Sequence, residues 1–114
     1  MKQNWMIYGA NGYTGALIAR TAVVQGLKPI LAGRRHEEIH SLANELGLEA
    51  RVFSLDEPNQ VLTGLREIDL VLHCAGPFSI TSAPMIEGCL AVSAHYLDIT
   101  GRPRLSTFDS NFVH

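Results

Sequence analysis

The stretch that decides the fold is Trp5–Gly15, which reads Trp-Met-Ile-Tyr-Gly-Ala-Asn-Gly-Tyr-Thr-Gly. Four apolar residues end at the first glycine, and a pattern typical of an amphipathic helix begins after the second. We expect Gly9 to form a tight turn, Gly12 to let a phosphate group approach the backbone, and Gly15 to let the helix pack close to a sheet. The spacing G-x-x-G-x-x-G is a shifted relative of the dinucleotide-binding fingerprint G-x-G-x-x-G.

The first turn of this helix supplies the hydrogen-bond donors of the predicted site. Backbone N–H groups from about Gly12 to Thr14 should face the phosphates, and the helix dipole favours negative charge there. The Thr14 hydroxyl adds a donor, and Asn11 and Tyr13 complete the loop. The alternative is a glycine-rich turn that binds nothing, but the strand before it and the helix after it weigh against that reading.

Short apolar runs alternate with longer amphipathic stretches along the rest of the chain. The expected strands are 5–8, 29–33, 50–55, 68–75 and 96–99, and the expected helices are 13–26, 37–46, a short one from Pro58, and 83–94. This alternation requires crossover connections and predicts a parallel α/β sheet. We expect a Rossmann-type, doubly wound sheet of about five strands, in the order 3-2-1-4-5 with helices on both faces. It should occupy residues 1–101, with 102–114 as a linker or the start of a missing second domain.

The second predicted strand ends in Ala-Gly-Arg-Arg at 32–35, with no carboxylate at its tip. A carboxylate there would bind the ribose hydroxyls of NAD and repel the 2′-phosphate of NADP, whereas a guanidinium binds a phosphate well. We therefore expect NADP(H) as the cofactor. Arg34 is the nearer contact to the 2′-phosphate, and Arg35 is the alternative contact or stacks on the adenine. Both arginines could instead be solvated charges at a helix entrance.

Ligands of open α/β sheets bind outside the carboxyl ends of the strands, so the other strand ends are candidates too. Either Asp56 or the backbone of Leu55 is expected to contact the adenine, and the alternative role of Asp56 is to cap the next helix. Ala75 and Gly76 leave room for the cofactor, and Pro77 fixes the chain as it turns away. His73 lies in a buried strand and is interpreted as a core histidine. The remaining histidines form no metal-binding pattern, so we expect no metal site.

The composition excludes several classes of partner. The net charge of the 114 residues is −2, so neither nucleic acid nor an anionic membrane surface is an expected partner. No apolar run approaches the roughly 18 residues of a membrane span, and no signal peptide is visible. Cys74 and Cys89 form no C-x-x-C pair and are expected to be buried free thiols, as in a reducing cytoplasm.

Together these segments resemble the N-terminal NADP-binding domain of the saccharopine dehydrogenase-like family of reductases. The resemblance rests on Gly-Ala-Asn-Gly-Tyr-Thr-Gly at 9–15, Ala-Gly-Arg at 32–34, Cys-Ala-Gly-Pro-Phe at 74–78, Gly-Cys at 88–89 and His-Tyr-Leu-Asp-Ile-Thr-Gly at 95–101. It implies that NADP(H) binds on the loop glycines, Thr14 and Arg34, with Ala75 and Gly76 near the nicotinamide. Family members usually have Glu after the last glycine, whereas this chain has Arg102.

The resemblance implies the NADP(H)-binding domain of an oxidoreductase. Family members carry a large second domain that shapes the substrate site. These 114 residues include none, so we expect the chain alone to be inactive and to meet a small-molecule substrate only with that domain. Apolar residues left exposed by its absence predict a homodimer. The alternative is a free-standing NADP(H)-binding sensor without redox activity. A short-chain dehydrogenase mechanism is excluded, because neither Lys2 nor Lys28 completes a Tyr-x-x-x-Lys pair.

Overall fold

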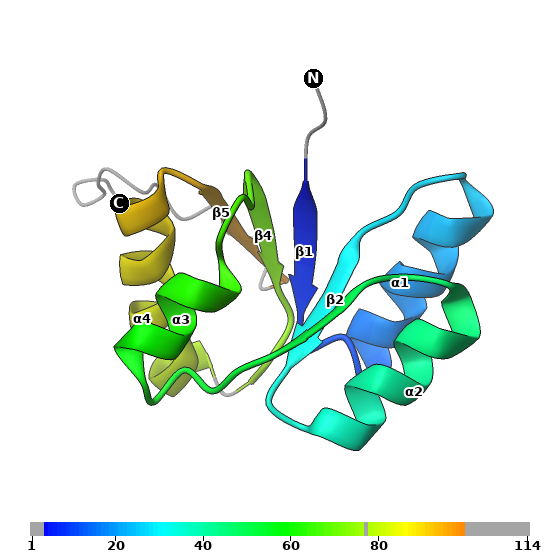
Figure 1. Cartoon of the computed structure of the whole chain (residues 1–114), viewed down its shortest axis with the longest axis horizontal. Coiled ribbons are helices and arrows are strands. Elements are labelled where there is room, and N and C mark those ends of the chain that lie inside the picture. The colour runs from blue at the N-terminus through cyan, green and yellow to red at the C-terminus, as the bar shows by residue number, and fades with distance from the viewer. Residues whose placement is uncertain (1–3, 77, 100–114) are drawn as a thin grey trace.

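The computed structural model describes residues 4–76 and 78–99, with residues 78–80 described by their backbone alone (Figure 1). The strands are β1 (Trp5–Tyr8), β2 (Ile30–Gly33), β3 (Ala50–Val52), β4 (Leu70–His73) and β5 (His95–Asp98). The helices are α1 (Tyr13–Val24), α2 (His36–Leu46), α3 (Pro58–Gly64) and α4 (Phe78–Val92). The predicted domain boundary at residue 101 and the segment 102–114 lie outside the described residues.

The five strands form one parallel sheet in the order β3-β2-β1-β4-β5, which confirms the predicted Rossmann-type topology. Tyr8 at the end of β1 pairs with Ala32 of β2 on one side and with His73 of β4 on the other. Because these three residues are in register, the loops after β1, β2 and β4 leave the sheet at the same edge. That edge is where a doubly wound sheet binds its ligand.

Helices cover both faces of the sheet, as predicted. Figure 1 shows α1 and α2 grouped on one side and α3 and α4 on the other. Alternate strand residues divide between two cores: Ile7 and Leu31 pack with Ile39 of α2, while Met6 and Val71 belong to the opposite core. The second core is completed by residues of the other strands and helices, among them Val61, Leu65, Met85, Cys89 and Tyr96.

One face of β5 is left open. Tyr96 and Asp98 are buried, whereas Leu97 and Ile99, which point the other way, are 43% and 36% exposed. Parallel sheets are normally covered on both faces, so this apolar edge is an exception to the pattern.

Several predicted element ends were wrong. The third strand was expected to reach residue 55, but β3 ends at Val52 because its neighbour β2 ends at Gly33. The Phe53 N–H donates to the Gly33 carbonyl oxygen at 3.0 Å, and beyond that bond β2 has no strand residues left to pair. Helix α4 begins at Phe78, before the predicted residue 83, and includes Pro84. The first helix ends slightly early, at Val24, and Gly26 follows with a positive φ of 83°.

Candidate functional site

A cavity of about 450 Å³ lies at the carboxyl ends of β1, β2 and β4. Eight of the predicted site residues line it: Gly9, Asn11, Gly12, Arg34, Arg35, Asp56, Ala75 and Gly76. Leu55, whose backbone was the alternative contact for the adenine, also lines the cavity, whereas five further lining residues were not assigned to the site from the sequence: Tyr8, Gly33, Ser54, Cys74 and Thr81. Tyr13, Thr14 and Gly15 are not part of the lining, and Pro77 lies outside the described residues. The structure therefore brings the glycine loop, the two arginines and the end of β4 around one space.

Gly9 is fixed in place by both neighbours of β1. Its φ of +87° is one that residues with a side chain rarely adopt, and its N–H donates to the Ala32 carbonyl oxygen of β2 at 2.7 Å. A Cβ at this position would lie 2.7 Å from the backbone nitrogen of Ala75, which follows β4. Gly9 is therefore needed for both the turn and the close approach of two loops.

Gly12 and Gly15 serve different purposes. Gly12 has φ −77° and ψ 170°, which any residue adopts, and a Cβ there would meet only the Gly9 carbonyl oxygen at 3.5 Å. It is exposed, so its lack of a side chain opens the cavity rather than the core. A Cβ on Gly15 would lie 2.9 Å from Cα of Ala10. We expected Gly15 to bring the helix against the sheet, but its close approach is to the turn that precedes the helix.

The free donors of the loop lie one residue later than predicted. The Gly12 N–H already donates to the Gly9 carbonyl oxygen at 3.1 Å. The first hydrogen bond of α1 runs from the Ala16 N–H to the Gly12 carbonyl oxygen at 2.8 Å, so the N–H groups of residues 13–15 have no helical acceptor. Together with the helix dipole they make the start of α1 a site for an anion.

The two arginines after β2 differ in their surroundings. Both are exposed and line the cavity. Arg35 Nη1 lies 3.9 Å from Glu38 Oε2, and Glu38 Oε1 accepts a 2.6 Å hydrogen bond from Asn11 Nδ2. Arg34 lies close enough to buried Tyr8 to act on the pKa of its phenol. Arg34 is therefore the arginine whose charge acts on Tyr8 in the cavity wall.

Tyr8 forms part of the cavity wall and is held in the neutral form. Its hydroxyl donates to the Phe53 carbonyl oxygen at 2.7 Å, and its ring contacts those of Phe53 and His73. Burial raises the pKa of Tyr8 to about 12, although the positive charge of Arg34 acts in the opposite direction. Burial likewise raises the pKa of the Cys74 thiol to about 11. Neither group is a ready proton donor at neutral pH.

His73 is a buried core histidine, as predicted, and it supports the backbone of the cavity. Its Nε2 lies 2.8 Å from Thr81 Oγ1, and the Thr81 hydroxyl donates to the Ala75 carbonyl oxygen at 2.8 Å. Because a hydroxyl has one proton to donate, the Nε2 of His73 carries the proton in this chain of bonds. Burial lowers the pKa of His73 to about 4, so the imidazole is neutral at pH 7.

Asp56 lies at the cavity and does not cap a helix. The N-cap residue of α3 is Glu57, without a side-chain cap bond, so the capping alternative for Asp56 was wrong.

Among residues 4–76 and 78–99, no three or more His, Cys, Asp and Glu side chains gather in a way that could hold a metal ion. None of the helices in this part of the chain has the length and apolar character needed to cross a membrane.

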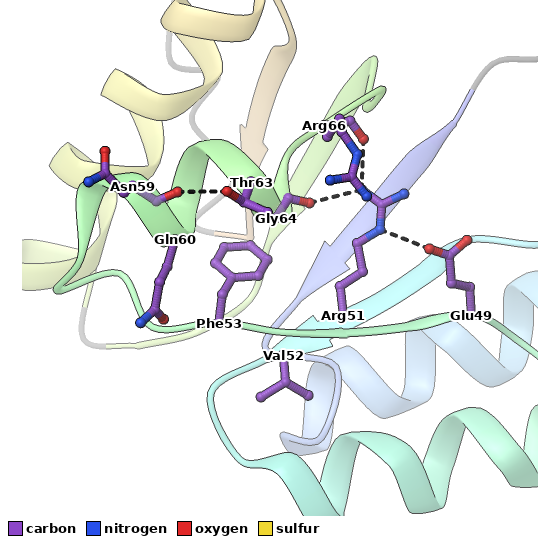
Figure 2. A pocket seen from close by; sticks show the side chains of 9 residues that line it. All are labelled: Glu49, Arg51, Val52, Phe53, Asn59, Gln60, Thr63, Gly64 and Arg66. Atoms are coloured by element: carbon purple, nitrogen blue, oxygen red, sulfur yellow. Dashed lines mark hydrogen bonds and ion pairs between the residues drawn. The ribbon is translucent and has the colours of Figure 1, made fainter.

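A second cavity, of about 510 Å³, lies between β3 and α3 and shows how a different arginine is used. In Figure 2, Arg51 reaches from β3 toward the end of α3, where its Nη1 donates to the carbonyl oxygens of Gly64 and Arg66 at 2.9 and 2.7 Å. Its Nε donates to Glu49 Oε2 at 2.9 Å. Arg51 thus joins two elements and is paired with a carboxylate, unlike Arg34.

The chain matches the profile of the family described as the saccharopine dehydrogenase NADP binding domain over residues 5–110. It is 28% identical to a trans-acting enoyl reductase of Mycobacterium leprae, covering 84% of this chain and 25% of that protein. It is 22% identical to the human saccharopine dehydrogenase-like oxidoreductase, covering 87% of this chain and 28% of that protein. The chain therefore spans about a quarter of the length of these relatives.

Solved structures share the fold. Saccharopine dehydrogenase (L-Glu forming) of Saccharomyces cerevisiae matches with a TM-score of 0.74 at 14% identity, covering 85% of this chain and 21% of that one. The Citrobacter triphenylmethane reductase complexed with NADP(H) matches with a TM-score of 0.72 at 18% identity, covering 83% and 36%. With the family match over most of its length, the chain belongs to the saccharopine dehydrogenase NADP-binding domain family.

Proposed function

We propose that this chain binds NADP(H) in the cavity at the carboxyl ends of β1, β2 and β4. The observation that carries the proposal is that the glycine loop and Arg34 line one cavity. The pyrophosphate would bind at the start of α1, where residues 13–15 offer N–H groups without helical acceptors. The adenine would lie toward Asp56, and the nicotinamide toward Ala75 and Gly76.

Arg34 is the proposed partner of the 2′-phosphate. The sequence left Arg34 and Arg35 as alternatives, and the ion pair of Arg35 with Glu38 favours Arg34. In the described part of the chain no carboxylate oxygen is paired with Arg34. A guanidinium that is not already paired gives a phosphate a charge-assisted hydrogen bond without first breaking another contact.

We further propose that the chain is the cofactor-binding part of an NADP-dependent oxidoreductase. Support comes from the names of its relatives, an enoyl reductase and a saccharopine dehydrogenase-like oxidoreductase. Among the titratable groups in the cavity wall and behind it, Tyr8, His73 and Cys74 have pKa values shifted by burial to about 12, 4 and 11. General acid–base catalysis works best with a pKa near the working pH, so these groups are poorly suited to it.

It follows that the 114-residue chain should bind NADPH without steady turnover. An assay of NADPH oxidation against aldehydes, ketones and imines tests this. Turnover by the purified chain that is lost in Gly12→Val would show that the chain is itself an enzyme.

The open face of β5, with Leu97 and Ile99 exposed, supports the further proposal of a homodimer. Light scattering of the purified chain would check this, and a monomer at all concentrations would overturn it.

Calorimetric titration of NADPH into the chain tests the binding proposal, with Gly12→Val as the decisive variant. A valine at residue 12 is compatible with the backbone there and would occupy the space proposed for the pyrophosphate. We expect binding by the unmodified chain and at least about tenfold weaker binding by the variant, with the same circular dichroism spectrum. Equal affinities in two folded chains would refute the placement of the pyrophosphate.

A further inference from the structure

Glu38 connects the two halves of the proposed cofactor site. It lies in the first turn of α2 and its side chain is 55% exposed. One carboxylate oxygen accepts a 2.6 Å hydrogen bond from Asn11 Nδ2 in the glycine loop. The other lies 3.9 Å from Nη1 of Arg35, in the segment after β2. This carboxylate, 27 residues from Asn11 along the chain, therefore joins the glycine loop to the segment after β2, and both segments line the cavity.

The two contacts have opposite consequences for a cofactor. The bond to Asn11 holds the loop that both NADPH and NADH would use, because both carry the pyrophosphate. The negative charge, in contrast, offsets that of Arg35 and lies beside the arginine segment where only a 2′-phosphate would bind. Like charges at the surface repel weakly but measurably, and the repulsion is screened by salt.

We propose that Glu38 is a specificity-determining residue that limits the preference for NADP(H) over NAD(H). Its charge reduces the affinity for the 2′-phosphate, while its role as a hydrogen-bond acceptor for Asn11 supports the binding of either cofactor. The inference rests on the proposed function, because it presumes the 2′-phosphate beside Arg34 and Arg35. The two roles are separable, since glutamine keeps an acceptor oxygen for Asn11 and removes the charge.

Glu37 provides a matched control. It is also exposed and also lies in the first turn of α2, so Glu37→Gln removes the same charge from the same helix end. In the described part of the chain it is not paired with Asn11 or Arg35. A difference between the two glutamine variants therefore reports the position of the carboxylate and not the change in net charge.

The test is calorimetric titration of NADPH and NADH into the unmodified chain, Glu38→Gln, Glu38→Ala and Glu37→Gln. We expect Glu38→Gln to bind NADPH about two- to fivefold more tightly, the size of one exposed charge pair, with NADH affinity unchanged. The gain should shrink at about 0.5 M salt. Glu37→Gln should show a smaller gain. Glu38→Ala, which also loses the acceptor for Asn11, should weaken NADH binding.

The outcomes separate this inference from the function on which it rests. If the unmodified chain prefers NADPH but Glu38→Gln binds it no more tightly, or no more tightly than Glu37→Gln does, the role of Glu38 is wrong and the proposed function stands. If Glu38→Gln gains affinity equally for both cofactors, the carboxylate does not act on the 2′-phosphate, and the inference is again wrong. If the unmodified chain binds neither cofactor, both proposals fall.

Discussion

The two sides of the cavity are built from different chemistry. On the side of β1 and β2, the start of α1 and Arg34 present hydrogen-bond donors and positive charge at the surface. On the side of β4, His73 is fully buried and neutral, and the partly buried Cys74 thiol is held protonated by burial. The first side is suited to recognising an anion, and the second to holding the backbone of Ala75 against Gly9. The difference agrees with the proposed function, in which the chain binds the cofactor and proton transfer falls to other groups.

The largest expected effect is on the stability of the fold, and it comes from placing a side chain at Gly9, where the loops after β1 and β4 meet. Gly9→Val would put a β-branched side chain at φ +87° and a Cβ 2.7 Å from the Ala75 nitrogen. We expect a loss of more than about 3 kcal/mol in the free energy of unfolding, measured with urea. Gly12→Val is the control, because it changes the same loop at a position with room for a Cβ, and its stability should stay within about 0.5 kcal/mol. Similar stabilities for the two variants would contradict the distinction between them.

The β4 side can be probed through the pH dependence of stability. The pKa of His73 is about 4 in the folded chain, against an ordinary 6.5. The unfolded chain therefore binds a proton at higher pH than the folded chain, and the stability from neutral His73 is lost as pH falls from about 6.5 to 4. We expect the unmodified chain to lose about 2 to 3 kcal/mol more than His73→Gln between pH 7 and pH 4.5. Glutamine keeps a donor toward Thr81 without titrating, and parallel pH profiles for the two chains would argue against a buried neutral imidazole.

The β1–β2 side can be tested by removing its charge. Arg34→Ala should weaken NADPH binding by about 1.5–3 kcal/mol, the size of a charge-assisted hydrogen bond, and should leave NADH binding nearly unchanged. Arg66→Ala is the matched control, since Arg66 is also exposed but lines the separate cavity beside β3 (Figure 2). If the control weakens NADPH binding as much as Arg34→Ala, the effect is one of overall charge and not of the site.

The fold was predictable because its signals are local. Trp5–Tyr8 is a short apolar run that stops at a glycine, and the alternation of such runs with helical patterns fixes a parallel sheet. The ends of elements were less predictable where neighbours decide them. Phe53–Leu55 has strand-like residues, but the sheet beside it ends at Gly33. No pattern within residues 50–55 carries that information.

Residues of the candidate site that belong to contiguous motifs were predictable from the sequence. Residues that reach the site through contacts between distant segments were not. The glycine loop and the arginine pair are contiguous motifs, so their residues could be named from sequence. Tyr8 was assigned only to a strand, because its contact with the Phe53 carbonyl joins positions 45 residues apart. Thr81 lay outside the predicted helix, and its bonds to His73 and Ala75 depend on where α4 begins. Glu38 lies within the predicted helix 37–46, and no role was assigned to its side chain from the sequence.

The central claim is that the side of the cavity formed after β1 and β2 recognises a cofactor with a 2′-phosphate. The most direct test is to titrate NADPH and NADH separately into the unmodified chain under one set of conditions and compare the two dissociation constants. We expect NADPH to bind at least about tenfold more tightly than NADH, a difference of about 1.4 kcal/mol. Equal affinities, or a preference for NADH, would contradict it.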